Sequence, residues 1–290
     1  MSQQPALAIF GEVLFDCFPD GAKKLGGAPF NVAWHLQAFG DQPLFISSVG
    51  DDEQGQQIRK AMQQWQLATD GLQTDKNHST GEVKVSLQGS EPSYEITADR
   101  AYDFIRTAEL PGLRNDAIVY HGSLALRNPV SQEAFEFLTR PASVSVFMDV
   151  NLRAPWWNKE DIYKCLERAR WCKLNQHELV ELGFNSADLQ QDMTRMQTHF
   201  QLEQLIVTRG EDVGIVRCND GTFYEQKRIA ADKLVDTVGA GDAFSAMYIH
   251  GLLAGWPVQK ILLHAQQFAS KVIGLRGAVS EDPAFYSEFT

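Results

Sequence analysis

The chain has 290 residues, of which 44% are hydrophobic and 22% charged, and its net charge is −11. This length is enough for one large α/β domain or two small ones, and the composition is ordinary for a globular protein. The acidic balance argues against a nucleic acid or an anionic membrane as partner, although local donors can still hold a phosphate. No apolar stretch reaches membrane-spanning length and Met1 to Ala6 lack the features of a signal peptide, so we expect a cytoplasmic protein. No C-x-x-C spacing occurs, so we expect buried free thiols at Cys17, Cys165, Cys172 and Cys218.

The N-terminal part predicts alternating strands and helices. Short apolar runs predict strands over 6–10, 13–18 and 44–49. Pro29 near the start and Gly40 at the end predict a helix over 29–39. A polar helix is expected over about 53–66.

Polar residues and glycines follow the first two strands. Asp16, the pair Gly26-Gly27 and Asn31 supply a carboxylate, an amide and a backbone that a ligand can approach closely. Such a set suits a ligand with many hydroxyl groups. A turn glycine pair and an exposed asparagine would explain the same residues without a ligand.

A hairpin interrupts this alternation. Strands are expected over 82–87 and 93–97, around the turn sequence G-S-E-P, with one buried and one solvated face. A two-sided hairpin here is expected to leave the main sheet and to form a small second sheet with residues 13–25. We therefore expect a single domain over 1–290, with a β lid formed by about 13–25 and 82–106.

From residue 107 onward, apolar strands alternate with helices. This order predicts a mostly parallel sheet covered on both faces, with ligands bound beyond the C-terminal ends of the strands. The dipeptide D-G at 220–221 predicts a hairpin between 214–218 and 222–224. The other strands are expected at 117–121, 144–149, 171–174 and 205–208, and the helices at 130–139, 159–169, 176–182, 188–200, 243–254 and 258–274.

Two polar strings follow strands of this predicted sheet. In D-V-N-L-R, Arg153 is placed to stabilise a transferring phosphate, or it is a surface arginine beside an asparagine turn. In N-Q-H-E, Asn175 and Glu178 have the spacing of a capping box, which would be a purely structural role. The same two residues would also suit the surroundings of a phosphate and its metal ion.

The string D-T-V-G-A-G-D at 236–242 ends a loop and opens an apolar helix. The free amides of a helix N-terminus form an anion site, and glycines at 239 and 241 let the anion approach the backbone. Asp242 at the edge of this site is favoured in its ionised form and suits a base that accepts a proton. A phosphate cradle beside a carboxylate is what phosphoryl transfer to a hydroxyl needs, although Asp, Thr and Gly also occur as simple helix caps.

The string at 236–244 resembles the C-terminal signature of the ribokinase/fructokinase (PfkB-type) family of sugar kinases. G-E-V-L-F-D followed by G-G-A-P-x-N is similar to the N-terminal signature of its fructokinase-like branch. The resemblance implies a ribokinase-like three-layer α/β/α domain, with a mostly parallel central sheet and a small β-sheet lid over the sugar. It also implies ATP-dependent phosphorylation of a primary hydroxyl.

Other acceptors and other classes of function stay open. The resemblance is greatest to fructokinases, so fructose is the expected acceptor. The alternatives are 2-keto-3-deoxygluconate, ribose and a nucleoside. A non-catalytic sugar- or nucleotide-binding regulator on the same fold would lack the base or the anion loop, and both are present. An NAD oxidoreductase is disfavoured because no G-x-G-x-x-G joins an early strand to its helix.

The resemblance also implies roles for particular residues. Glu178 is expected to act on Mg²⁺ through water, and the loop at 236–238 with the turn at 277 is expected to hold K⁺. The alternative for Asp236 is that it only caps the loop through backbone amides, and then no cation is needed. A protruding lid sheet could also pair with the lid of another copy in a homodimer. The implied sets are Asp242, Gly239, Ala240, Gly241 and Arg153 for catalysis; Asp16, Gly26, Gly27, Asn31 and Asn151 for the sugar; Asn175, Thr208, Gly210 and Gln267 for ATP; and Asp236, Val238 and Gly277 for K⁺.

Overall fold

The computed structural model describes residues 4–88, 91–209, 213–227, 229 and 234–289. Within these residues the main sheet has nine strands, in the order β13-β12-β11-β10-β9-β8-β1-β4-β5. The pairs from β11 to β5 are parallel, and the last two strands, β12 and β13, pair antiparallel at one edge. The strands are β1 (Leu7–Phe10), β4 (Leu44–Gly50), β5 (Leu72–Asp75), β8 (Ile118–His121), β9 (Ser145–Asp149), β10 (Trp171–Asn175), β11 (Gln204–Thr208), β12 (Val213–Cys218) and β13 (Phe223–Lys227).

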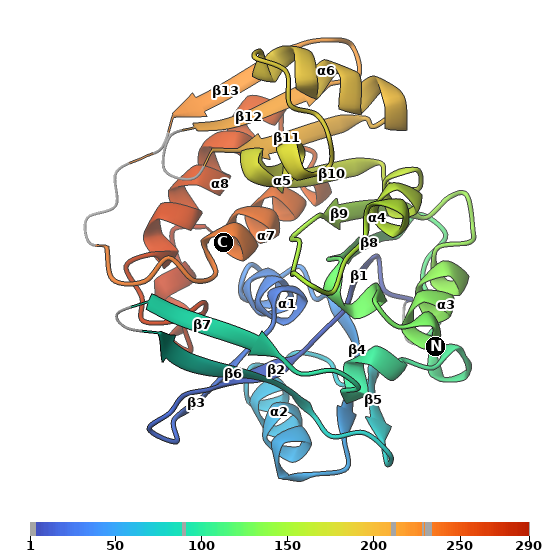
Figure 1. The fold of residues 1–290 in the computed structure, drawn as a ribbon, viewed down its shortest axis with the longest axis vertical. Helices are drawn as coiled ribbons and strands as arrows, with labels where there is room; N and C mark the ends of the chain where they lie inside the picture. The colour runs from blue at the N-terminus through green and yellow to red at the C-terminus, as the bar shows by residue number, and fades with distance from the viewer. Residues whose placement is uncertain (1–3, 89–90, 210–212, 228, 230–233, 290) are drawn as a thin grey trace.

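Helices cover both faces of this sheet (Figure 1), which confirms the predicted three-layer α/β/α architecture. One face packs against α1 (Ala28–Ala38), α2 (Glu53–Gln64), α7 (Ala240–Leu253) and α8 (Val258–Val272). The other packs against α3 (Pro129–Leu138), α4 (Lys159–Leu166), α5 (Gln176–Glu181) and α6 (Leu189–Phe200). Short 3₁₀ helices are η1 (Ala101–Phe104), η2 (Thr107–Glu109), η3 (Leu124–Leu126) and η4 (Pro283–Tyr286).

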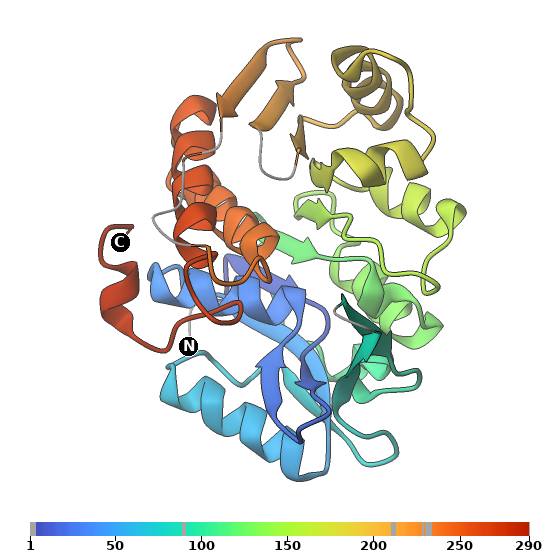
Figure 2. The same cartoon turned by 60° about the vertical axis from the view of Figure 1, so that its left-hand side comes forward.

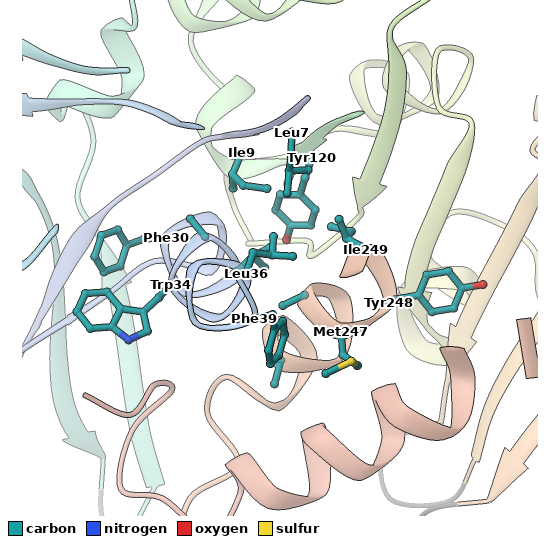
Figure 3. Close-up of a cluster of buried hydrophobic side chains, with 14 of the residues drawn as sticks. Leu7, Ile9, Phe30, Trp34, Leu36, Phe39, Tyr120, Met247, Tyr248 and Ile249 are labelled. Carbon is teal, nitrogen blue, oxygen red and sulfur yellow. The ribbon is translucent and has the colours of Figure 1, made fainter. Parts of the chain in front are cut away.

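The core next to the site lies between β1, β8 and the helices α1 and α7. Figure 3 shows Ile9 and Tyr120 facing Leu36 of α1 and Ile249 of α7. Helix α7 is buried along most of its length, from Ala243 to Ile249, which is why its sequence is apolar on all sides. A helix embedded in this way holds its N-terminus in a fixed position relative to the strand ends.

A second sheet of four strands leaves the main sheet directly after β1. Its order is β3-β2-β6-β7, with β2 and β6 parallel and the other two pairs antiparallel. Figures 1 and 2 show its strands (blue and blue-green) outside the main sheet. The predicted hairpin is confirmed, and the strands are β2 (Leu14–Cys17), β3 (Lys23–Gly26), β6 (Gly81–Gln88) and β7 (Glu91–Ile96).

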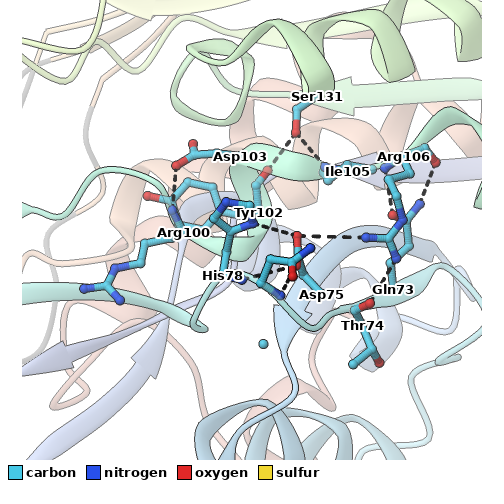
Figure 4. Close-up of polar contacts among 12 residues, drawn as sticks. Gln73, Thr74, Asp75, His78, Arg100, Tyr102, Asp103, Ile105, Arg106 and Ser131 are labelled. Atoms are coloured by element: carbon cyan, nitrogen blue, oxygen red, sulfur yellow. Dashed lines mark hydrogen bonds and ion pairs between the residues drawn. The ribbon is translucent and has the colours of Figure 1, made fainter.

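The return from the small sheet is tied to the main domain by hydrogen bonds (Figure 4). Ser131 Oγ donates to the carbonyl of Tyr102 and accepts from the amide of Ile105, both at 2.9 Å. The side chain of Gln73 accepts from the amide of Arg106 at 2.7 Å and donates to its carbonyl at 2.9 Å. Gln73 belongs to β5, a strand that the sequence did not predict because L-Q-T-D carries few apolar residues.

All four cysteines are free thiols, as expected from their spacing, but the expectation of burial is correct only for Cys172, since Cys17, Cys165 and Cys218 are half-buried. No helix in the described part of the chain is long and apolar enough to cross a membrane.

Candidate active site

The N-terminus of α7 is open. The helix begins at Ala240, three residues earlier than the apolar pattern predicts, and its N-cap Gly239 makes no side-chain hydrogen bond. Gly239 has a φ of +81°, and a Cβ there would lie 2.4 Å from the Cβ of Ala278. Only glycine fits this position. No side chain caps the first-turn amides. The amide of Ala240 makes a long hydrogen bond of 3.4 Å to the carbonyl of Thr237, and those that follow it are left available to an anion.

Asp242 lies in this first turn and is joined to α1. Its Oδ2 accepts a hydrogen bond of 2.8 Å from Nδ2 of Asn31. Desolvation raises the pKa of Asp242 to about 6, Asn31 and Lys173 act in the opposite direction, and Asp149 reinforces the rise. The sequence predicts that the helix end favours the ionised form, but desolvation outweighs that effect. At pH 7 the carboxylate still predominates, and a pKa near 6 suits a general base.

A buried ion pair lies beneath the anion loop. Lys173 Nζ donates to both carboxylate oxygens of Asp149, at 2.9 and 3.1 Å, and approaches the carbonyl of Gly241 at 3.5 Å. Ser245 Oγ of α7 donates to the same carboxylate at 2.8 Å. The pair thus couples β9 and β10 to the first turn of α7. Lys173 was missed in the sequence, although a lysine within the apolar run W-C-K-L-N was a signal for such a pair.

The residues expected to hold the sugar lie at the junction of the two sheets. A Cβ on Gly26 would be 3.7 Å from Oδ2 of Asp16, and a Cβ on Gly27 would be 2.7 Å from the carbonyl oxygen of Glu12. Gly27 also has a φ of +111°, so the close approach and the backbone both require glycine. Burial raises the pKa of Asp16, and Lys24 opposes this effect. Asn31 keeps a buried Oδ1 without a partner in the described residues.

Asn151 and Arg153 follow β9 at the same edge of the sheet. The carbonyl of Asn151, whose φ is +40°, accepts from Oγ of Ser123 at 3.1 Å. Arg153 is exposed and donates through Nη1 to the carbonyl of Leu152 at 3.1 Å. The positive charge of Arg153 lowers the pKa of Asp242. The charge of Arg153 therefore acts on the same region of the molecule as Asp242.

Glu178 and Asn175 form the capping box that their spacing allows. Oε2 of Glu178 accepts from the amide of Asn175 at 2.8 Å, and Oδ1 of Asn175 accepts from the amide of Glu178 at 2.9 Å. Oε1 of Glu178 accepts from the amide of Leu152 at 2.8 Å, so this buried carboxyl joins the loops after β9 and β10. Burial raises its pKa, against the effect of the amide of Asn175.

The carboxylates around the site could hold a metal ion only indirectly, through water molecules or the phosphates of a substrate. Both oxygens of Glu178 already accept backbone amides, and the carboxylate of Asp149 is taken by Lys173 and Ser245. Among the described residues no group of three or more His, Cys, Asp or Glu side chains is arranged to hold a metal. Mg²⁺ usually keeps several waters and binds substrate phosphates, so such a site needs no protein cage.

The residues expected to contact the nucleotide are spread along the second half of the sheet. Thr208 at the end of β11 is paired in register with Asn175 at the end of β10. Gly210 lies outside the described residues. Gln267 is exposed on α8, and its neighbour Gln266 is the residue that faces β12, with Nε2 2.8 Å from a Cβ placed on Gly214.

Asp236 joins the loop before α7 to the turn at 277. Its Oδ1 accepts from the amide of Val238 at 3.1 Å, and its Oδ2 accepts from the amide of Gly277 at 3.2 Å. The sequence leaves open a purely capping role for Asp236, and these two hydrogen bonds are what that role requires. Each carboxylate oxygen retains a lone pair, so a cation held by neighbouring carbonyls remains compatible with the arrangement.

An open helix N-terminus beside a carboxylate, at the strand ends of a doubly covered parallel sheet, is an arrangement that suits phosphoryl transfer to a hydroxyl. The model of the pfkB family carbohydrate kinases matches residues 17–284. The chain belongs to this family and is an ATP-dependent carbohydrate kinase.

Individual relatives agree with this assignment. The fructokinase of Klebsiella pneumoniae is 31% identical over 264 residues, which cover 85% of this chain and 83% of the relative. The fructokinase of Salmonella typhimurium is 30% identical, with 95% of each protein covered. A fructokinase double mutant from Vibrio cholerae O395, crystallised with fructose, ADP and a potassium ion, shares the fold with a TM-score of 0.82 at 22% identity, and 99% of each chain is covered. The sugar kinase PH1459 of Pyrococcus horikoshii in complex with ATP is 26% identical, with a TM-score of 0.77 over 94% of this chain and 93% of that one.

Proposed function

We propose that this enzyme is a fructokinase, which transfers the γ-phosphoryl group of ATP to a primary hydroxyl of fructose. The observation that carries the proposal is the position of Asp242, a carboxylate with a pKa near 6 beside the uncapped N-terminus of α7. The curated fructokinases that cover most of the chain support fructose as the acceptor.

In the proposed reaction, Asp242 accepts the proton of the sugar hydroxyl. The hydroxyl oxygen then forms a bond to the γ-phosphorus as the bond from that phosphorus to the leaving ADP oxygen breaks. The backbone amides of Gly239, Ala240 and Gly241, with that of Asp242, stabilise the developing charge, because they point at it before the reaction begins. Arg153 adds a positive charge on the same side.

The sugar is held between the small sheet and α1. Asp16 and Asn31 supply hydrogen-bonding groups, and Gly26 and Gly27 allow the sugar to approach the backbone. Asn151 contributes from the end of β9. We propose that the small sheet acts as a lid that limits attack by water on ATP. Pairing of two lids in a homodimer is a further prediction, which gel filtration with light scattering tests.

ATP is proposed to lie along the ends of β10 and β11, near Asn175 and Thr208, with Gly210 and Gln267 as further predicted contacts. Mg²⁺ would arrive with the phosphates and neutralise their charge, and Glu178 would orient one of its waters. Asp236 with the carbonyls at Val238 and Gly277 would hold K⁺. The Vibrio cholerae fructokinases crystallised with potassium or calcium ions support a cation site.

The test is a coupled assay of ADP release with fructose, ribose, 2-keto-3-deoxygluconate, adenosine and aminoimidazole riboside. We expect fructose to give the highest kcat/KM, by about tenfold or more, since a site built on hydrogen bonds rejects a misplaced hydroxyl strongly. A higher kcat/KM for another acceptor would make that compound the preferred substrate, while the proposed phosphoryl transfer would stay the same. Sugar binding without ADP release from any acceptor would instead favour the regulator.

A further inference from the structure

Glu12 lies where the chain passes from the main sheet to the small sheet. The amide of Gly11 makes a hydrogen bond of 3.1 Å to the carbonyl of Ile46 in β4, and β2 of the small sheet begins at Leu14. Glu12 is 3% exposed. Its carbonyl oxygen is the atom that would lie 2.7 Å from a Cβ on Gly27, so its backbone lines the glycine pair assigned to the sugar.

The carboxyl of Glu12 is incompletely satisfied. Its Oε2 is buried and has no hydrogen-bond partner among the described residues. No salt bridge joins it to Arg127 or Arg153, the two described arginines whose charges act on it. Arg127 is instead committed to Asp103, at 2.8 Å.

Two further buried polar atoms near the base share this condition. Oδ1 of Asn31 and the hydroxyl of Tyr120 have no partner among the residues that the structure describes. Figure 3 shows the Tyr120 hydroxyl directed toward the α1 and α7 side of the sheet. Charges of Glu12 and Asp242 both act on Tyr120. Asn31 is hydrogen-bonded to Asp242, and Tyr120 on β8 is paired in register with Ile9 of β1, the strand that leads to Glu12, so these atoms lie at the same end of the sheet.

Buried polar atoms without partners are costly, so a native protein keeps several of them together mainly where a ligand or water completes their hydrogen bonds. A sugar fits this region because each hydroxyl both donates and accepts. The carbonyl of Glu12 lies beside Gly27, the N-cap of α1, and Asn31 in the first turn of α1 is the hydrogen-bond partner of Asp242. Asp16 lies further along the chain, within β2 of the small sheet. Glu12 thus lies toward the Asp242 end of the proposed sugar site, and Asp16 lies at the lid end.

We propose that Glu12 is a substrate-binding residue that hydrogen-bonds a non-reacting hydroxyl of the sugar at the end of the site next to Asp242, and that it thereby helps select the acceptor. This inference rests on the proposed function and extends it to a residue outside the assigned sugar set.

The protonation of Glu12 is compatible with this role. Burial raises its pKa to about 7, while its own backbone amide and Arg153 oppose the rise and Asp242 adds to it. Near neutral pH part of the population is a neutral carboxylic acid, which donates one hydrogen bond and accepts others. The groups that surround Glu12 electrostatically are Arg127, Arg153, Asp242, Tyr102 and Tyr120.

The experiment compares Glu12→Ala, Glu12→Gln and the control Glu203→Gln. Glu203 precedes β11 at the opposite end of that strand from Thr208, and its carboxylate is paired with Arg170 at 2.6 Å. We measure kcat, the KM values for sugar and ATP, and sugar binding without ATP by tryptophan fluorescence, with thermal melts for each variant.

We expect Glu12→Ala to raise the sugar KM and the sugar Kd by about tenfold or more, the effect of losing a hydrogen bond from a buried site, and to leave the ATP KM within about twofold. Glu12→Gln keeps the shape and is expected to change the ratio of kcat/KM between fructose and ribose by about fivefold or more. Glu203→Gln is expected to leave all of these values unchanged.

An unchanged sugar Kd in both variants, or equal effects on sugar and ATP, would overturn the proposal. If Glu12→Ala does not fold, the sugar Kd and the fructose-to-ribose ratio of Glu12→Gln decide. Failure of the proposed function would appear separately, as absence of turnover in the unmodified enzyme. In that case the fluorescence titrations of the unmodified protein and Glu12→Gln still decide whether Glu12 contacts a sugar.

Discussion

Two helices at the same edge of the sheet begin in contrasting ways. Helix α5 is closed by a capping box, in which Asn175 and Glu178 take up each other's backbone amides. Helix α7 is left open by Gly239, which supplies no capping side chain. Both carry an acidic residue in the first turn, Glu178 in α5 and Asp242 in α7.

The difference separates a structural helix start from a site. Both carboxylate oxygens of Glu178 accept backbone amides, one from Leu152 after β9 and one from Asn175 at the end of β10. Asp242 has a single side-chain partner among the described residues, Asn31, and no side chain caps the amides beside it. The open start costs local stability that the burial of α7 offsets, as expected for a functional site. Variants at the two helix starts test this contrast.

The largest effect is expected from Asp242→Asn. The amide keeps the shape but accepts no proton, so we expect kcat to fall by roughly 10² or more, with the KM values for sugar and ATP nearly unchanged. Steady-state kinetics and fluorescence titrations measure both. A variant that keeps more than about a third of the original turnover would remove Asp242 from the role of base.

The pH dependence of the unmodified enzyme tests the same residue. A base with a pKa near 6 is protonated below that value, so kcat should rise with pH through about 6 and Asp242→Asn should lose this limb. The pKa is raised on folding, so the folded state binds the proton more tightly than the unfolded chain. Asp242 therefore favours folding most at low pH, and this contribution is lost as pH rises through about 6. Asp242→Asn should consequently melt no lower than the unmodified enzyme at pH 8.

Gly239→Ala is expected to have the next largest effect. The added Cβ meets Ala278 at 2.4 Å and strains a backbone with a φ of +81°, so the loop and its amides must move. We expect kcat to fall by about tenfold to 10², as for loss of a preorganised anion-hole donor. Gly255→Ala is the matched control, since Gly255 also has a positive φ of +65° but open space around its Cβ. Equal turnover in the two variants would contradict the role of the open helix start.

Glu178→Gln should affect stability more than catalysis. The side-chain NH₂ of the glutamine would then face a backbone N–H, and both are donors. Loss of a buried hydrogen bond to a charged group lowers the free energy of unfolding by about 1.5–3 kcal/mol. Urea denaturation measures this change. If Glu178 also orients a metal-bound water, the Mg²⁺ concentration for half-maximal activity rises several-fold.

Asp188→Ala serves as the comparison for Glu178→Gln. Asp188 caps α6 through the amides of Gln190 and Gln191 on an exposed surface, and its loss should destabilise without altering the Mg²⁺ dependence. If Glu178→Gln also lowers stability without altering the Mg²⁺ dependence, Glu178 serves only as part of the cap of α5.

The sequence predicted the elements well where local patterns decide. Apolar runs located the parallel strands, and D-G at 220–221 located the antiparallel hairpin. The missed strand β5 has the buried polar residue Gln73, whose hydrogen-bond partner Arg106 lies 33 positions along the chain. Periodicity carries no information on such partners.

The same limit applied to the site. The proximity of Asn31 to Asp242, 211 positions apart, was implied only by family resemblance. The pair Lys173–Asp149 and the unsatisfied carboxyl of Glu12 were missed, because burial and contact across strands emerge only from packing. Burial likewise reversed the expected direction of the pKa shift of Asp242.

The smallest effect concerns the loop that leads into α7. Asp236 connects this loop to the turn at Gly277 through amides, and carbonyls with one carboxylate are the hard oxygen donors that alkali ions prefer. A bound K⁺ would not contact ATP. It would fix the loop so that the amides from Gly239 to Asp242 point at the phosphate, which is a preorganisation effect.

We therefore expect K⁺ to raise kcat by about two- to fivefold, a fraction of the effect of one anion-hole donor, with no change in Mg²⁺ dependence. The assay titrates KCl against choline chloride at fixed ionic strength, in protein first stripped of K⁺ and Na⁺. Asp236→Asn should abolish the response, and Asp220→Asn is the matched control, since Asp220 also accepts the amide two residues on, at 2.8 Å in the β12–β13 turn. A rate that stays flat with K⁺ in the unmodified enzyme would leave Asp236 as a cap. The α7 loop would then owe its order to protein hydrogen bonds alone, as the start of α5 does.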